Sequence, residues 1–211
     1  AMRVAEIWRY PVKSLAGEQL TVADVSALGI ARDREIVIVH HDRIATARRY
    51  PKLLGLRGSL DDAGVATIQG HAWNSAQAQT IVEAAVGGPV RLVHVAGPER
   101  FDVLPLLLAT DGAIAAMGVD RRRFRPNILL ADVDGLEERS WPGRQIRIGE
   151  VVISAEKLRE RCVMTTYDPD TQAQDLGVLK RIVREFDGTM ALDCSVVAPG
   201  KIHLGDAVQL L

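Results

Sequence analysis

Short runs of β-branched and aliphatic residues, separated at close intervals by glycine, proline and aspartate, extend through the whole sequence. Such runs are typical of half-buried strands joined by turns. The clearest is EIVIVH at residues 35–40, and the turn-like HDR that follows it predicts a hairpin. Further strands are predicted at residues 4–11, 19–25, 53–60, 65–69, 90–95, 127–131, 145–148 and 151–155, and three brief strands within 192–211. Many short strands at regular spacing favour a β-barrel or a pair of packed sheets.

Helices are predicted in three places only. Apolar residues recur at helical spacing from Leu176 to Phe186, which predicts a helix over residues 175–187. Shorter helices are expected at 77–86 and at 111–117, the latter with Asp111 as its N-cap. We therefore expect a mainly β fold of the α+β class, rich in β-barrel structure. Gly97-Pro98 is the only plausible seam, so the expected domains are residues 1–96 and 97–211, closely packed.

Charge and composition exclude several classes of function. The 26 basic and 27 acidic residues nearly balance, and aromatic residues make up only 4%, which argues against a general nucleic-acid-binding protein. No secretory signal is evident, and the longest apolar stretch, residues 103–109, is interrupted by Pro105 and too short for a membrane helix. Two cysteines without a CxxC pair indicate a reducing cytoplasm, and they are too few for an iron–sulfur cluster on this chain.

The two cysteines have different surroundings. Cys162 lies beside Arg159 and Arg161, whose charges favour the thiolate, and a thiolate is either a nucleophile or a ligand for a soft metal. The alternative is a buried structural residue. Cys194 lies between Asp193 and Ser195 with no cation nearby in the sequence, so a structural role is favoured there.

Basic residues near predicted turns form a second group of candidates. Arginine binds phosphate oxygens in a bidentate manner, so side chains at the ends of several strands would together hold an anion. The alternative is scattered surface charge, which is favoured for the run at residues 121–123. The group comprises Lys13, Ser14, Arg32, Arg34, Thr46, Arg48, Arg49, Arg125 and Asn127, of which Arg125 and Asn127, placed where a strand begins, are the better pocket candidates.

Seven segments, in order along the chain, resemble the MOSC family, which is named after the C-terminal domain of molybdenum cofactor sulfurase. They are IWRYPVKS (7–14), RDR (32–34), TARRYPKL (46–53), RFRPNI (123–128), ERSW with IG (138–149), RC with TTYDPDT (161–171), and PGKI with GD (199–206). Each motif alone is weak, but together they cover nearly the whole chain.

The resemblance implies a β-barrel-rich fold that binds the molybdenum cofactor, Mo-molybdopterin. Family members such as the mitochondrial amidoxime reducing component and its bacterial relatives reduce N-hydroxylated compounds. By position, Cys162 would be the catalytic thiolate ligand of molybdenum. The residues that would hold the pterin and its phosphate are Lys13, Ser14, Arg34, Thr46, Arg48, Arg125, Asn127, Arg161, Thr165 and Asp168.

Three functions remain open from the sequence. The first is a molybdenum enzyme that reduces a small N-hydroxylated compound with electrons from a separate redox protein, since this chain lacks the cysteines for a cluster. The second is a carrier of the cofactor, or of sulfur as a Cys162 persulfide, without turnover. The third is a β-barrel that binds a partner and no cofactor. Glu160 departs from the family pattern, and a carboxylate there opposes thiolate formation at Cys162.

Overall fold

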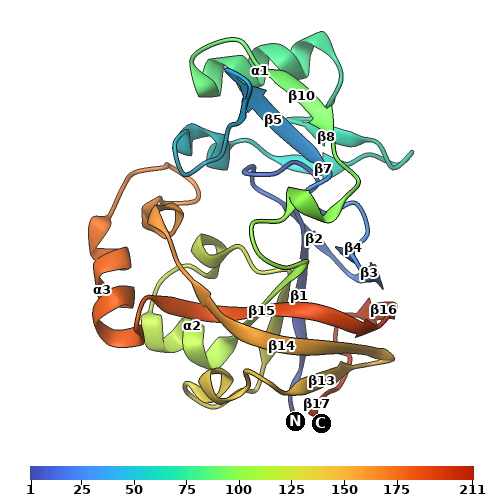
Figure 1. Cartoon of the computed structure of the whole chain (residues 1–211), viewed down its shortest axis with the longest axis vertical. Helices are drawn as coiled ribbons and strands as arrows, with labels where there is room; N and C mark the ends of the chain where they lie inside the picture. The colour runs from blue at the N-terminus through green and yellow to red at the C-terminus, as the bar shows by residue number, and fades with distance from the viewer.

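An eight-stranded, mostly antiparallel sheet forms the larger part of the molecule (Figure 1). The computed structural model describes all residues, 1–211. In spatial order the strands are β17 (Val208–Leu210), β13 (Gln145–Ile148), β14 (Val151–Glu160), β15 (Thr189–Ala198), β11 (Leu106–Thr110), β12 (Ile128–Ala131), β1 (Arg3–Arg9) and β2 (Glu18–Leu20). Only the β11–β12 pair is parallel. The prediction of a mainly β fold is confirmed.

The sheet curls without closing into a continuous barrel. One isolated antiparallel bridge joins Arg3 of β1 to Ala207, just before β17, and the two chain ends lie together (Figure 1). Besides this bridge, the amide of Val4 donates to the carbonyl of Asp206 and the amide of Val208 donates to the carbonyl of Met2, but β1 and β17 form no continuous ladder. The expected barrel is therefore corrected to an open, strongly curled sheet around an apolar core that contains Ile7, Leu108 and Ile146.

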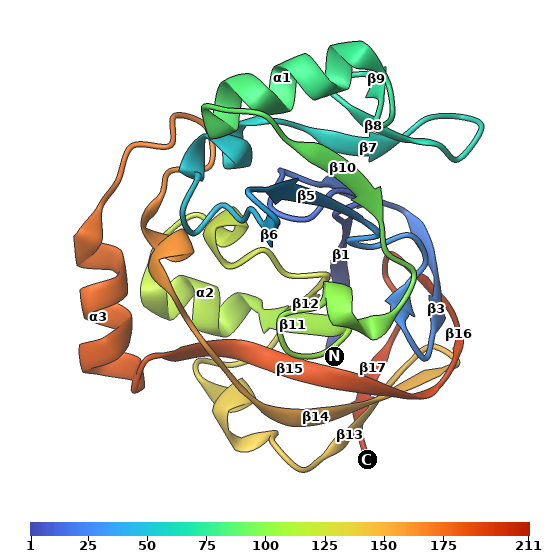
Figure 2. The same ribbon diagram turned by 45° about the horizontal axis from the view of Figure 1, so that its top comes forward.

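A smaller unit packs above this sheet (Figure 2). It contains two three-stranded sheets and the helix α1 (Ala76–Val86), which lies across its outer side. The sheets are formed by β10 (Arg91–His94), β5 (Ile36–His40) and β6 (Arg43–Ile44), and by β7 (Gly58–Leu60), β8 (Ala66–Ile68) and β9 (His71–Ala72). Their shared core includes Ile38, Leu53 and Val82, so all of its buried members come from residues 12–90.

The N-terminal segment belongs to both units. β1 and β2 extend the large sheet, and β3 (Val22–Ser26) pairs with β4 (Gly29–Ile30) and with β16 (Gly200–His203) from the other end of the sequence. Val25 and Ile30 are buried in the core of the larger unit. The domain boundary near residue 97 stays a prediction, and before it the chain alternates between the two apolar cores: Val12 and Leu15 lie in the smaller core, residues 23–30 contribute to the larger, and Ile36 to Val90 return to the smaller.

All three predicted helices are present, and two of them share a separate core. α2 (Asp111–Met117) and α3 (Leu176–Phe186) enclose Met117, Phe124 and Ile182. Arg181 donates to the carbonyls of Met117 at 2.6 Å and of Ala116 at 3.0 Å, which satisfies free carbonyl groups at the end of α2. None of the three helices is long and apolar enough to cross a membrane.

Several details of the sequence prediction are wrong. The N-cap of α2 is Thr110, whose hydroxyl accepts from the amide of Ala113, whereas Asp111 lies inside the helix. The first half of the strand expected at 53–60 is a 3-10 helix, η1 (Pro51–Gly55). β11 was not predicted, although it is central to the large sheet, and β14 and β15 each reach ten residues where shorter strands were expected.

The helical core provides a test of the fold. Ile182 is fully buried in α3, whereas its neighbour Val183 is 58% exposed. Ile182→Ala is expected to lower the free energy of unfolding by about 2–5 kcal/mol, because it removes buried methyl groups and leaves a cavity. The matched control Val183→Ala should change it by less than about 0.5 kcal/mol. Urea denaturation followed by circular dichroism measures both, and equal effects would contradict this packing.

Candidate functional site

One cavity lies where loops of the two units meet, and residues from distant parts of the sequence line it. Nine of the residues singled out in the sequence are among them: Lys13, Ser14, Arg34, Thr46, Arg48, Arg125, Asn127, Arg161 and Cys162. Lys13 and Ser14 follow β1, Arg34 precedes β5, and Thr46 follows β6. Cys162 lies two residues after the end of β14, so this long strand of the large sheet places the thiol at the cavity.

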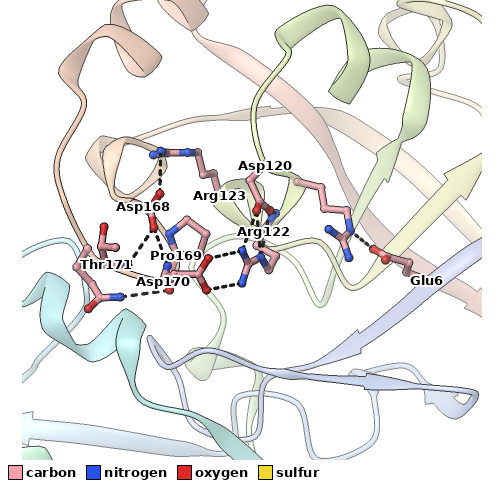
Figure 3. A network of polar contacts seen from close by, with 10 residues as sticks. Glu6, Asp120, Arg122, Arg123, Asp168, Pro169, Asp170 and Thr171 are labelled. Atoms are coloured by element: carbon pink, nitrogen blue, oxygen red, sulfur yellow. Dashed lines mark hydrogen bonds and ion pairs between the residues drawn. The ribbon is translucent and has the colours of Figure 1, made fainter.

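Two predicted site residues do not line this cavity. Thr165 is fully buried, and its hydroxyl donates to the carbonyl of Cys162 at 2.9 Å, so it fixes the turn that carries the thiol. Asp168 lies in an outer loop, where one carboxylate oxygen accepts from the amides of Asp170 and Thr171 (Figure 3). These two residues shape loops around the site.

The cavity concentrates positive charge. Eight of its lining residues are lysine or arginine and three are aspartate or glutamate, in a chain whose net charge is −1. Several cations that the sequence analysis did not assign contribute to this excess: Arg100, Arg123 and Arg159. A cavity with such an excess attracts anionic ligands.

Arg161 has donor groups that no atom of the protein satisfies. Its Nη2 donates to the carbonyl of Phe124 at 2.7 Å, but Nε and Nη1 are buried without a hydrogen-bond partner. Burial lowers the pKa of Arg161 to about 10. A buried donor without a hydrogen-bond partner costs about 1–3 kcal/mol, and the cost is higher when the group is charged. An anion in the cavity would supply the missing acceptors.

Two guanidinium groups stack on one tyrosine ring. The Cζ atoms of Arg34 and Arg125 lie 4.3 and 4.5 Å from the centroid of the Tyr10 ring. Arg34 is paired with Asp33 at 2.7 Å, whereas Arg125 makes no ion pair and no side-chain hydrogen bond, and burial lowers its pKa to about 10. Burial also raises the pKa of Tyr10 to about 12, so the ring stays neutral between the two cations. Arg125 is thus a second, partly buried cation without a counter-ion.

Three of the lining residues adopt left-handed backbone conformations. The φ angles are 77° at Ser14 and 55° at both Arg34 and Arg125. For residues other than glycine this conformation costs roughly 1–2 kcal/mol each. Such strain persists only where surrounding contacts enforce it, and it clusters at functional sites. The chain therefore maintains an unfavourable backbone at three points around one cavity.

A buried carboxylate that the sequence analysis quoted but did not assign holds this arrangement. Asp33 is fully buried and accepts from the amide of Tyr10 at 2.8 Å, from Arg34 at 2.7 Å and from Nδ2 of Asn127 at 3.2 Å. Asn127 also accepts from the amide of Leu107 at 3.1 Å and from Arg34 at 3.3 Å. Its side chain is fully used within the protein, so Asn127 positions Arg34.

Lys13 is held at the opposite wall. Its Nζ donates to the carbonyl of Arg100 and to Asp102, both at 2.8 Å. Burial alone would raise the pKa of Asp102, but the hydrogen bond and charge of Lys13 outweigh it and hold that pKa below its usual value. Arg100 is itself almost completely buried, and its Nε donates to the carbonyl of Asp33 at 2.9 Å. The two walls of the cavity are therefore connected through Asp33.

Cys162 is the accessible thiol of the chain. It is half-buried and lines the cavity, whereas Cys194 is fully buried in the large core, where burial raises the pKa of its thiol. No group of three or more His, Cys, Asp or Glu side chains in the chain is placed to hold a metal ion. A metal at this site would thus have one protein ligand, Cys162, with its other ligands supplied by a cofactor.

The arginine run at 121–123 is more structural than its sequence suggested. We expected solvated charges, but Arg121 pairs with Glu6 at 2.6 Å and the side chain of Arg123 is only 12% exposed (Figure 3). Arg122 pairs with Asp120 and with Asp170, each at 2.8 Å. The run lies in the 3-10 helix η3 (Arg121–Phe124) that leads into Arg125, and these ion pairs fix its position.

Known families match both parts of the sequence. Residues 1–96 match the family described as MOSC N-terminal beta barrel domain, and residues 84–209 match the MOSC domain. Mitochondrial amidoxime-reducing component 1 of Homo sapiens is 26% identical over 280 residues, which cover 99% of this chain and 82% of that protein. Molybdenum cofactor sulfurase 2 of Culex quinquefasciatus is 38% identical over 68 residues, covering 32% of this chain and 9% of that protein.

A solved structure has the same fold. The YUAD protein from Bacillus subtilis superposes with a TM-score of 0.55 at 15% sequence identity, covering 100% of this chain and 96% of that chain. The match to the MOSC domain spans more than half of the sequence and includes Cys162 and five of the eight cations that line the cavity. The resemblance read from seven short motifs is confirmed, and the chain belongs to the MOSC domain family.

Proposed function

We infer that this protein binds the molybdenum cofactor in the cationic cavity and reduces N-hydroxylated compounds. The observation that carries this proposal is that the accessible thiol of Cys162 shares one cavity with eight cations, among them Arg161 with two buried, unpartnered donors. The cofactor combines a soft metal, which favours a thiolate ligand, with a phosphate, which requires cationic donors. Relatives named for amidoxime reduction align over nearly the whole chain.

The residues of the site divide into two groups. Some would contact the cofactor, and others position the residues that contact it. Cys162 would ligate molybdenum, and the free donors of Arg161 and Arg125 would bind anionic oxygens. Arg34, beside Arg125 on the Tyr10 ring, and Lys13, from the opposite wall, would add charge, with Ser14 and Thr46 as hydroxyl donors. Asn127, Asp33 and Thr165 would act through their neighbours, because their polar atoms already bond within the protein.

The reaction requires two electrons and two protons, which convert an N–OH group into N–H and release water. When bound, the cofactor would supply two-electron oxygen-atom-transfer chemistry next to Cys162. The protein excludes bulk water from the buried part of the cavity and holds the cations in place before ligand arrives, so no reorganisation is needed on binding. The electrons come from a separate electron-transfer protein in a reducing, cytoplasmic setting.

A second function is favoured by one observation. The thiol of Cys162 accepts no hydrogen bond and is half-buried at the cavity, so it is available to carry a persulfide sulfur to a cofactor bound beside it. Such a sulfur or cofactor carrier would show exchange of its cargo without turnover. The two functions differ in whether Cys162 holds metal or sulfur.

Replacing the cavity thiol tests the reductase. Cys162→Ala, in protein produced with active cofactor synthesis, is expected to reduce benzamidoxime at least about a hundredfold more slowly with a reduced viologen as donor, because ligand loss exceeds the 10–100-fold typical of outer-shell changes. Molybdenum and pterin analysis of the same samples reports retention. The matched control Cys194→Ala, in the core, should keep both.

Turnover by Cys162→Ala at the wild-type rate would contradict the proposal. Intact mass spectrometry separates the carrier, since a persulfide adds about 32 Da, one sulfur atom, to Cys162 and is removed by a thiol reductant. Wild-type protein that carries this adduct, exchanges cofactor and shows no reduction of benzamidoxime would establish the carrier in place of the reductase.

The unpaired cations predict anion-dependent stability. Inorganic phosphate should raise the Tm of cofactor-free protein, because a ligand present at a hundred times its Kd stabilises the folded state by about 2.7 kcal/mol, roughly 5–10 °C for a chain of this size. Chloride at equal ionic strength should not. Differential scanning calorimetry of Arg161→Gln should show the phosphate shift reduced, and the exposed control Arg147→Gln should retain it. If phosphate raises the Tm of Arg161→Gln and of Arg147→Gln equally, Arg161 does not bind the anion.

A further inference from the structure

A second cavity adjoins the first and shares part of its wall. Arg123, Arg125 and Met164 line both cavities, while the opposite side of the second is formed by residues 54–57 and by the loop at 167–170. The second cavity has no residue among those that the family motifs assign to the cofactor except Arg125. It therefore offers a separate space next to the proposed reaction centre.

Aromatic rings line this second cavity. Trp8 on β1 and Tyr10 just after it are nearly parallel, with their centroids 6.3 Å apart and their planes 16° apart, and Tyr167 comes from the facing loop. With only 4% aromatic residues in the chain, three at one cavity is a local enrichment. Tyr10 is buried and already covered by Arg34 and Arg125, so Trp8, Tyr167 and the polarisable thioether of Met164 are the groups suited to a flat aromatic ligand, which gains from stacking and sulfur contacts.

Two cations at the second cavity have no partner in the protein. The side chains of Arg57 and Arg125 make no ion pair and no hydrogen bond, whereas Arg122 is bound by Asp120 and Asp170. Guanidinium groups bind carboxylates in a bidentate manner and also stack on aromatic planes. The free charge at this cavity is therefore positive and suited to an aromatic ligand that carries an acidic group.

The loop wall is held in place before any ligand binds. Arg122 donates to both carboxylate oxygens of Asp170, at 2.9 and 2.8 Å, and Asp168 accepts from two amides of the same loop (Figure 3). Gln172 donates to the carbonyl of Pro169 at 3.2 Å and closes the turn. A wall fixed in this way lowers the conformational cost of binding.

We propose that the second cavity binds the organic part of the substrate and selects flat aromatic compounds that carry a carboxylate. That this ligand is a substrate rests on the proposed reductase function, whereas its binding depends only on the second cavity. The aromatic ring lies against Trp8 and Tyr167, and the carboxylate pairs with Arg57. The shared wall of Arg123, Arg125 and Met164 then brings the rest of the molecule toward Cys162.

Calorimetric titration of the purified protein tests the binding without turnover. The probes are 4-carboxybenzamidoxime, uncharged benzamidoxime and the saturated-ring analogue of the first, 4-carboxycyclohexane carboxamidoxime. The aromatic acid is expected to bind about tenfold tighter than either of the other two, the scale of one strong contact. Equal affinity for the aromatic and the saturated acid would overturn the proposal.

Variants assign the two contacts. Arg57→Gln should weaken the acid about tenfold and leave uncharged benzamidoxime unchanged, whereas Trp8→Leu should weaken both aromatic probes. The matched control Arg91→Gln removes an exposed arginine on β10 that lines neither cavity, and it should bind all probes as the wild type does. Wild-type affinities in Arg57→Gln and Trp8→Leu would place the probes elsewhere.

Steady-state kinetics of the cofactor-loaded protein separates this inference from the reductase function. Arg57→Gln should raise KM for the aromatic acid and leave kcat unchanged, because the removed contact lies away from the reacting N–OH group. If Arg57→Gln and Trp8→Leu turn over the aromatic acid with the wild-type KM, the proposed substrate site is wrong, although the reductase function is supported. Selective binding without any turnover would sink the reductase while the second cavity remains a ligand site.

Discussion

The buried carboxylate of Asp33 is the interaction on which the rest of the site depends. It fixes the end of β1 through the amide of Tyr10, neutralises Arg34 and orients Asn127, while its own carbonyl receives Arg100. A buried guanidinium without such a partner would be costly, and a buried carboxylate without these donors equally so. One residue between the two units thus sets the position of cations on both walls of the first cavity.

Two cations of the first cavity, Arg161 and Arg125, are not neutralised by Asp33 or by any other carboxylate. Two donor nitrogens of Arg161 are buried without partners, Arg125 has no counter-ion, and Ser14, Arg34 and Arg125 hold left-handed backbone conformations. Each of these features costs free energy in the unliganded state. An anion bound in the cavity would compensate the two unpaired cations, as the proposed function requires.

Sequence reasoning succeeded where a pattern is local and failed where it depends on contacts across the fold. The short β-branched run of β5 and the helical spacing in α3 identified both elements. β11 was missed because it consists mostly of leucine and alanine, which favour helices, and shows neither a β-branched run nor an alternating pattern. Within the site, Cys162 and its neighbours were found from motifs, but Arg100 acts through Asp33, 67 residues earlier, and no spacing rule reveals such a pair.

The shared wall gives Arg125 a role that neither cavity explains alone. Its guanidinium stacks on Tyr10, lines both cavities and carries the only unpaired charge common to the two. An anion bound in the first cavity screens this charge and weakens its attraction for a second anion, whereas a cofactor-free cavity leaves it fully available. The two cavities are therefore coupled electrostatically, and the acidic preference of the second must come mainly from Arg57, which lines only that cavity. Selectivity for the ligand's ring and its charge can then be changed separately from retention of the cofactor.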